Sequence, residues 1–81
     1  MTTEISRRVK VGAVFEGTIV TPKWFVWENR RRMIAQVTWR WHTMDGETRI
    51  AHFSVTDGGN LFELTFNPVT LEWRLVRVTG G

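Results

Sequence analysis

The chain has no cysteine, and this absence removes several classes of protein from consideration. A disulfide framework, a thiolate metal site and a cysteine nucleophile are all excluded. No window holds a run of about 18 apolar residues, which is the length a membrane-spanning helix requires. Residues 1–10 are polar and charged and include no apolar run, so they do not match a signal peptide. We therefore expect a cytoplasmic protein with no membrane segment.

The sequence also lacks the patterns that accompany catalysis or metal binding. Neither of its serines, Ser6 and Ser54, has a base at a recognisable spacing, and no pair of carboxylates suggests shared acid–base chemistry. The two histidines, His42 and His52, have no third nitrogen ligand and no thiolate to complete a metal site. We predict that the protein is not an enzyme and has no catalytic residues, no metal, no cofactor and no small-molecule substrate.

Tryptophan and arginine are the residue types that stand out among those present. The chain of 81 residues, long enough for one domain, has five tryptophans, and its net charge is +3. Nine of the eleven cationic residues are arginine, which stacks on aromatic rings and binds phosphate in a fork. This composition is compatible with affinity for nucleic acid or another polyanion, but a soluble small domain with a slightly basic surface accounts for it more simply.

Helical spacing of apolar residues is missing over any stretch of about 11 residues or more, and the segments alternate as strands do. Residues 1–10 are predicted to be a flexible polar tail, and residues 11–21 a first strand that Pro22 ends. Strands over 23–27 and 31–41 follow. The turn between them lies within residues 28–30, and its length stays open. A two-residue turn places Trp24 on the face of Met33, whereas a three-residue turn places Phe25 and Trp27 there.

The next two turns carry clearer signals. Residues 44–46 suit a three-residue loop with Gly46 left-handed, which sets Trp39 against Ala51; a two-residue loop at 45–46 sets Trp39 against His52. We take the first register, because it separates apolar from polar side chains better. A two-residue loop at 58–59 pairs six apolar residues on one face, namely Val55 with Phe62, Phe53 with Leu64, and Ala51 with Phe66.

A last strand over 73–78 completes an all-β domain spanning residues 11–78, followed by a frayed end at 79–81. We predict a single, strongly twisted antiparallel meander of five or six strands. Because no helix is available to cover its apolar face, it must either curl into a partly open barrel or dimerise. The predicted core consists of Met33, Val37, Trp39, Phe53, Val55, Phe62, Leu64, Phe66, Trp73 and Leu75.

The arginine run at 30–32 is the strongest candidate for a functional feature. Alternate strand residues share a face, so Arg30 and Arg32 can lie with Arg40 beside an exposed Trp24 or Trp27. Basic groups beside aromatic rings are what single-stranded nucleic acid requires. The structural alternative is a solvated hairpin tip whose arginines cover the indoles. The first hypothesis is therefore a binding module with weak, sequence-independent affinity for single-stranded nucleic acid.

A second hypothesis is self-association or binding of a protein partner. The predicted outer face carries more apolar side chains than a monomer needs, among them Ile34, Ile50, Leu61 and Val76.

Strand and turn residues follow one another in a fixed order from residue 22 to residue 78, namely Pro22, Phe25, Trp27, Arg30, Arg31, Val37, Phe53, Val55, Phe62, Glu63, Leu64, Trp73 and Leu75. This order resembles a family of small Trp-rich bacterial proteins known as a domain of unknown function, with Asn29 where glycine is expected and Met33 where tyrosine is expected. The resemblance implies an antiparallel β domain of bacterial origin and transfers no catalytic or binding residues.

Overall fold

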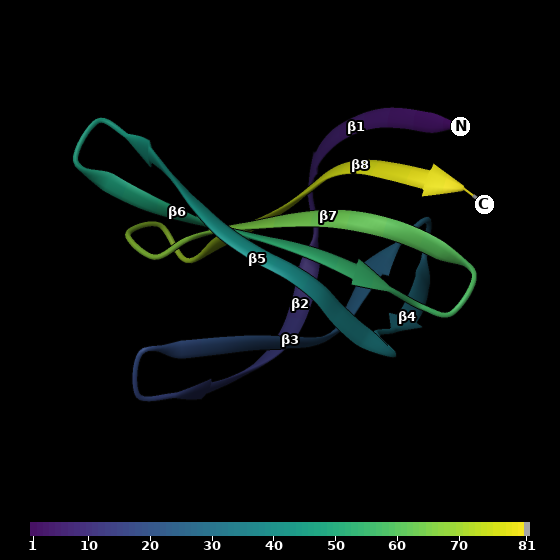
Figure 1. Cartoon of the computed structure of the whole chain (residues 1–81), viewed down its shortest axis with the longest axis horizontal. Helices are drawn as coiled ribbons and strands as arrows, with labels where there is room; N and C mark the ends of the chain where they lie inside the picture. The colour runs from purple at the N-terminus through teal and green to yellow at the C-terminus, as the bar shows by residue number, and fades with distance from the viewer. Residues whose placement is uncertain (81) are drawn as a thin grey trace.

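The computed structural model describes residues 1–80, and these residues form β-strands and no helix (Figure 1). Every strand pair is antiparallel, which confirms the predicted all-β antiparallel fold. A helix long and apolar enough to cross a membrane is absent from this part of the chain. The strands are β1 (Thr2–Arg8), β2 (Lys10–Glu16), β3 (Ile19–Trp27), β4 (Arg30–Met33), β5 (Gln36–Asp45), β6 (Thr48–Thr56), β7 (Asn60–Asn67) and β8 (Glu72–Gly80).

The strands are arranged as two sheets rather than the single meander that we predicted. The five-stranded sheet has the order β1-β8-β7-β6-β5, and the three-stranded sheet has the order β2-β3-β4. Figure 1 shows the second sheet lying beside one face of the first, with the chain termini together on β1 and β8. The apolar face of the larger sheet is thus covered by another part of the same chain, and the sheets do not close into a barrel.

Two short corners carry the chain from one sheet to the other. At the first, the Val9 amide donates to the Trp73 carbonyl of the larger sheet at 3.0 Å, and the next residue already pairs within the smaller sheet. At the second, the Ile34 amide donates to Lys23 of β3 at 3.0 Å, and the Ala35 amide donates to Thr56 of β6 at 2.8 Å. β1 with β2, and β4 with β5, are therefore two bent segments, and the second bend is why residues 31–41 resemble one strand in the sequence.

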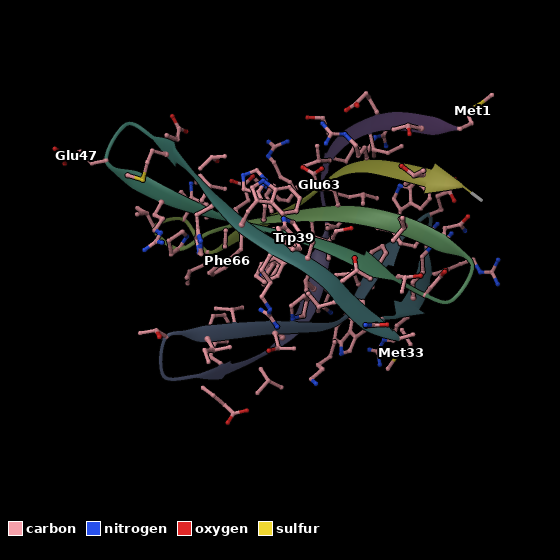
Figure 2. The ribbon with its side chains drawn as sticks, viewed as in Figure 1. Met1, Met33, Trp39, Glu47, Glu63 and Phe66 are labelled. Atoms are coloured by element: carbon pink, nitrogen blue, oxygen red, sulfur yellow. The ribbon has the colours of Figure 1, made fainter. Side chains whose placement is uncertain are left out.

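The core lies between the two sheets, and Phe25 links them. Phe25 of the smaller sheet is fully buried and meets Phe62 of the larger one edge-on, with ring centroids 4.9 Å apart. Seven of the ten predicted core residues are buried, and Val37 packs against them. Met33 and Trp39 were predicted wrongly, because their side chains are 61% and 66% exposed. Figure 2 shows Trp39 on β5 and Met33 at the end of β4.

The β6–β7 hairpin has the predicted register. Val55 pairs with Phe62, Phe53 with Leu64, and Ala51 with Phe66. Asp57 fixes the turn, because its carboxylate accepts hydrogen bonds from the amides of Gly59 and Asn60, both at 2.9 Å. The bonds from Asn60 and then Gly59 lower the pKa of Asp57, since they stabilise its charged form.

The β5–β6 hairpin has neither of the registers that we considered. Its two-residue loop is Gly46-Glu47, so Asp45 pairs with Thr48 and Arg40 pairs with Phe53. A bulge at Thr38 then shifts the register by one residue, and Val37 consequently pairs with Val55. The bulge explains the error at Trp39: it places Val37 and Arg40 toward the core and sends Trp39 outward.

The β3–β4 hairpin settles the loop length that the sequence left open. Glu28 and Asn29 both have positive φ, 54° and 60°, as a two-residue loop of this kind requires. Trp24 consequently pairs with Met33, and Phe25 pairs with Arg32. The predicted strand at 11–21 is instead two strands, because the chain turns at Gly17-Thr18, and Pro22 lies buried within β3 rather than ending a strand.

The segment predicted as a flexible tail is a strand. β1 pairs with β8 from Thr2 to Arg8, with a bulge at which Ser6 has a φ of 52°. At the other end, Thr79 and Gly80 belong to β8, whereas the predicted fraying of Gly81 lies outside the described residues. The ordered strands therefore extend past both ends of the predicted domain.

Candidate functional site

The net charge of the protein is concentrated in the smaller sheet. Residues 10–33, which form that sheet, contain five cationic side chains and two glutamates, a surplus of three. The rest of the chain contains six cationic side chains and six carboxylates, so it is neutral. The whole surplus of +3 thus belongs to one sheet, whose cations are Lys10, Lys23, Arg30, Arg31 and Arg32.

Ion pairs hold Arg8, Arg74 and Arg77 of the larger sheet, whereas Arg7, Arg40 and Arg49 form none with any residue in 1–80. Arg77 bonds to Glu4 at 3.0 Å and also to Glu63, and both partners raise the pKa of the Arg77 guanidinium, the bond to Glu4 most. In the smaller sheet, Arg32 pairs with Glu28 at 3.3 Å. The other four cations are exposed and form no ion pair with any residue in 1–80.

A stack of three groups stands on the outer face of the smaller sheet. The Trp24 indole lies across Gly12 of β2, so closely that a Cβ on Gly12 would be 2.1 Å from Trp24 Cε2. The Arg31 guanidinium carbon lies over the same ring, 4.2 Å from its centroid. The missing side chain at Gly12 therefore leaves room for the indole beside β2, and Arg31 covers one face of the ring. A ligand that approaches this face of the indole meets the Arg31 cation.

The strand register places a second cation beside this stack. Lys10 and Arg31 both pair with Val26, from β2 and β4 respectively, so the three residues form one row across the sheet. Gly12, Trp24 and Met33 form the next row on the same face. With neighbouring strands about 4.8 Å apart, Lys10 and Arg31 are roughly 10 Å apart across this face. We call this surface, defined by Lys10, Trp24, Arg31 and Met33, the cationic face.

The residues predicted from the sequence are divided among different surfaces. Arg30 and Arg32 do share a side of β4, but it is the side of Trp27, opposite Trp24. Arg32 is mostly buried: its guanidinium carbon is 5.0 Å from the Trp27 centroid and 5.9 Å from the Phe62 centroid. The structural alternative, in which arginines cover the indoles, describes Arg32 on Trp27 and also Arg31 on Trp24.

Arg40 is not part of a surface with the other predicted residues. Its Nη1 donates to the Val20 carbonyl at 2.6 Å, its Nη2 donates to Thr21 Oγ1 at 3.3 Å, and its guanidinium covers Phe53 at 5.4 Å. Arg40 thereby ties β5 of one sheet to β3 of the other. Lys10 and Arg31 are the residues that we did not select, and a two-residue loop at 28–29 is the signal that would have placed Arg31 beside Trp24.

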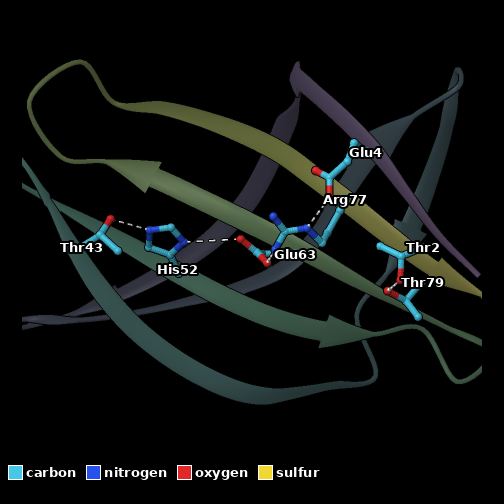
Figure 3. Close-up of polar contacts among 7 residues, drawn as sticks. All are labelled: Thr2, Glu4, Thr43, His52, Glu63, Arg77 and Thr79. Carbon is cyan, nitrogen blue, oxygen red and sulfur yellow. Dashed lines mark hydrogen bonds and ion pairs between the residues drawn. The ribbon is translucent and has the colours of Figure 1, made fainter.

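A row of polar side chains crosses the outer face of the larger sheet, one from each strand (Figure 3). Thr43 Oγ1 lies 2.7 Å from His52 Nε2, and His52 Nδ1 lies 3.6 Å from Glu63 Oε2. A hydroxyl, an imidazole and a carboxylate in this order resemble a hydrolase triad. However, 3.6 Å exceeds a hydrogen bond, and Glu63 is bound by Arg77, so the carboxylate does not orient the imidazole as in a triad. The row links the strands.

The described residues hold no group of three or more His, Cys, Asp or Glu side chains that could bind a metal. Comparison of the chain with protein-family models, curated proteins and solved structures finds no match in any of the three. The resemblance to small Trp-rich bacterial proteins stays a prediction, as do the bacterial origin and the cytoplasmic location.

Proposed function

We propose that this protein is a non-enzymatic module that binds single-stranded nucleic acid through its cationic face, without preference for base sequence. The observation that carries the proposal is the stack of Arg31 on Trp24, in the sheet that holds the whole charge surplus. Arg31 is exposed and pairs with no carboxylate in residues 1–80. Its guanidinium is thus held in place while its donors and charge are available to a ligand.

The chemistry of the face suits a single strand better than a folded or neutral partner. An exposed guanidinium such as that of Arg31 can stack on a base and donate hydrogen bonds to a phosphate along its edge. Lys10 adds a point charge across the sheet, and the exposed Met33 side chain adds apolar surface beside the indole. The proposed contacts of these groups are with phosphates and base faces, so affinity should depend on charge and stacking rather than on sequence.

Salt dependence provides the test. Binding of a fluorescently labelled oligothymidylate is measured by anisotropy at about 50 mM and about 200 mM salt. If three to four phosphates are contacted, the logarithm of affinity falls against the logarithm of salt concentration with a slope of roughly −2 to −3. Arg31→Gln and Lys10→Gln should each weaken binding and make the slope less steep by about 0.7.

The matched control is Arg49→Gln, which removes the same charge from an exposed position on β6. It should leave affinity nearly unchanged. Equal losses from Arg49→Gln and Arg31→Gln would mean that net charge alone drives binding, and the cationic face would be rejected. Absence of binding at the lower salt concentration would reject the proposed function itself.

A further inference from the structure

The free edge of β5 is a second surface suited to contact with another chain, and it belongs to the larger sheet, away from the cationic face. From Trp39 to Asp45, β5 pairs without interruption with β6, and no strand of the described chain pairs with its other side. The other three edges are less suitable: β4 has only four residues, β1 is interrupted by its bulge at Ser6, and β2 contains Gly12 and has charged residues, Lys10 and Glu16, at its ends. A long uninterrupted edge is a template for another strand.

The hairpin register determines which backbone groups on this edge are free. Asp45 and Thr48 flank a two-residue loop, so they form a hydrogen-bonded pair, and such pairs alternate along the strand. The amides and carbonyls of Arg40, His42 and Met44 consequently point away from β6. Outside the β5–β6 ladder, these groups form no backbone hydrogen bond within residues 1–80. Three consecutive donor and acceptor positions are thus available.

The side chains beside this edge favour addition of a strand. Trp39 and Trp41 lie on the outer face, and Trp39 is largely exposed. The stretch from Trp39 to Met44 has no proline or lysine, the residues that commonly protect edges. Its one charged side chain, Arg40, is drawn under the sheet to Val20 and Thr21, so it does not shield the free backbone groups. Figure 2 shows Trp39 near the middle of β5.

We infer that β5 pairs antiparallel with β5 of a second copy of this chain, joining the two larger sheets into one continuous sheet. A second copy fits because the edge complements itself. With Trp41 opposite Trp41 of the second copy, Arg40 meets His42 and Trp39 meets Thr43, and the four indoles gather on one face. Aligning Arg40 with its own counterpart would instead place like charges directly opposite each other, which is unfavourable.

This arrangement can be blocked with little effect on the fold, because the His42 amide points away from β6 and donates no backbone hydrogen bond within residues 1–80. His42→Pro removes that amide, and proline is tolerated at such a position on an edge strand. His42→Ala removes the same side chain but keeps the amide, so it is the matched control. Sedimentation equilibrium is measured from about 10 µM to about 1 mM protein, a range that reveals dimers of modest affinity. Circular dichroism checks that both variants are folded.

We expect the natural chain and His42→Ala to form a reversible dimer, and His42→Pro to weaken dimerisation by about tenfold or more. In the natural chain, hydrogen exchange followed by NMR should show protection of the Arg40 and His42 amides that rises with concentration. The Trp41 and Thr43 amides, already bonded to β6, should not change. A chain that stays monomeric at about 1 mM, or a folded His42→Pro variant that dimerises as well as His42→Ala, would overturn the inference.

Discussion

The two sheets use their arginines in different ways. In the larger sheet, Arg77 bridges Glu4 and Glu63, and Arg8 pairs with Glu72 at 2.7 Å, so these two cations connect neighbouring strands. In the smaller sheet, Arg31 lies on Trp24 and pairs with no described carboxylate. Charge that is paired within the protein holds strands together, whereas charge that is positioned but unpaired is available to a ligand. The location of the surplus positive charge therefore indicates more about where a ligand could bind than the net charge of +3 does.

The first way to test this comparison is to separate the sheets at Phe25. Phe25→Ala empties a fully buried site against Phe62, and we expect a loss of about 3–5 kcal/mol in the free energy of unfolding. Urea titration followed by tryptophan emission measures the loss. Met33→Ala, an exposed apolar position on the same sheet, is the control and should change stability by less than about 0.5 kcal/mol. A small loss for Phe25→Ala would show that the sheets do not share one core.

A smaller effect is expected from disturbing the stack on the cationic face. Gly12→Ala places a methyl group where the Trp24 indole lies, so the ring must move away from β2 and Arg31 loses its support. We expect a loss of about 1–3 kcal/mol in stability, measured by urea titration, together with weaker oligothymidylate binding. Gly59→Ala is the control, since its nearest neighbour, Asp57 Oδ1, is 3.7 Å from the added Cβ. If a folded Gly12→Ala variant bound oligothymidylate as well as the natural chain, the stack of Arg31 on Trp24 would not be needed for binding.

The smallest effect concerns the paired charges. Arg77→Gln leaves Glu63, a largely buried carboxylate, without its partner, and we expect a loss of about 1 kcal/mol because Arg77 itself is partly exposed and screened by solvent. The loss should shrink in high salt. Arg31→Gln should cost about 0.5–1 kcal/mol, because it ends only the contact with Trp24. Denaturation at low and high salt compares the two, and a larger loss for Arg31→Gln would reverse the proposed division of roles.

The fold could be predicted where the residues that specify a strand pair are close together in the sequence, and not where they are far apart. The β6–β7 hairpin was predicted residue by residue, because its loop glycines and its alternating apolar residues are close in sequence and agree with each other. The strand at Thr2–Arg8 was missed, because its partner β8 lies at the opposite end of the chain and its own side chains are mostly polar. Nothing local in a polar segment distinguishes a tail from an edge strand.

The candidate site was predicted only in part for a similar reason. The arginine run and the tryptophans indicated the hairpin that carries the stack, but one residue of loop length decides whether Trp24 or Trp27 shares a face with Arg31. Both predicted indoles do contact arginine, Trp24 on the outer face and Trp27 on the inner one. Grouping Arg40 with them failed, because its role depends on Val20 and Thr21 in the other sheet.

By itself, the sequence determined that this chain forms antiparallel strands, since alternation and turn residues act between neighbours along the chain. It also determined which face of the β6–β7 hairpin is apolar. Only the tertiary structure decided that one ribbon becomes two sheets, that a bulge at Thr38 turns Trp39 toward solvent, and that the surplus charge gathers on one sheet. Those outcomes depend on which distant segments pack against each other, and no local pattern of residues specifies these tertiary contacts.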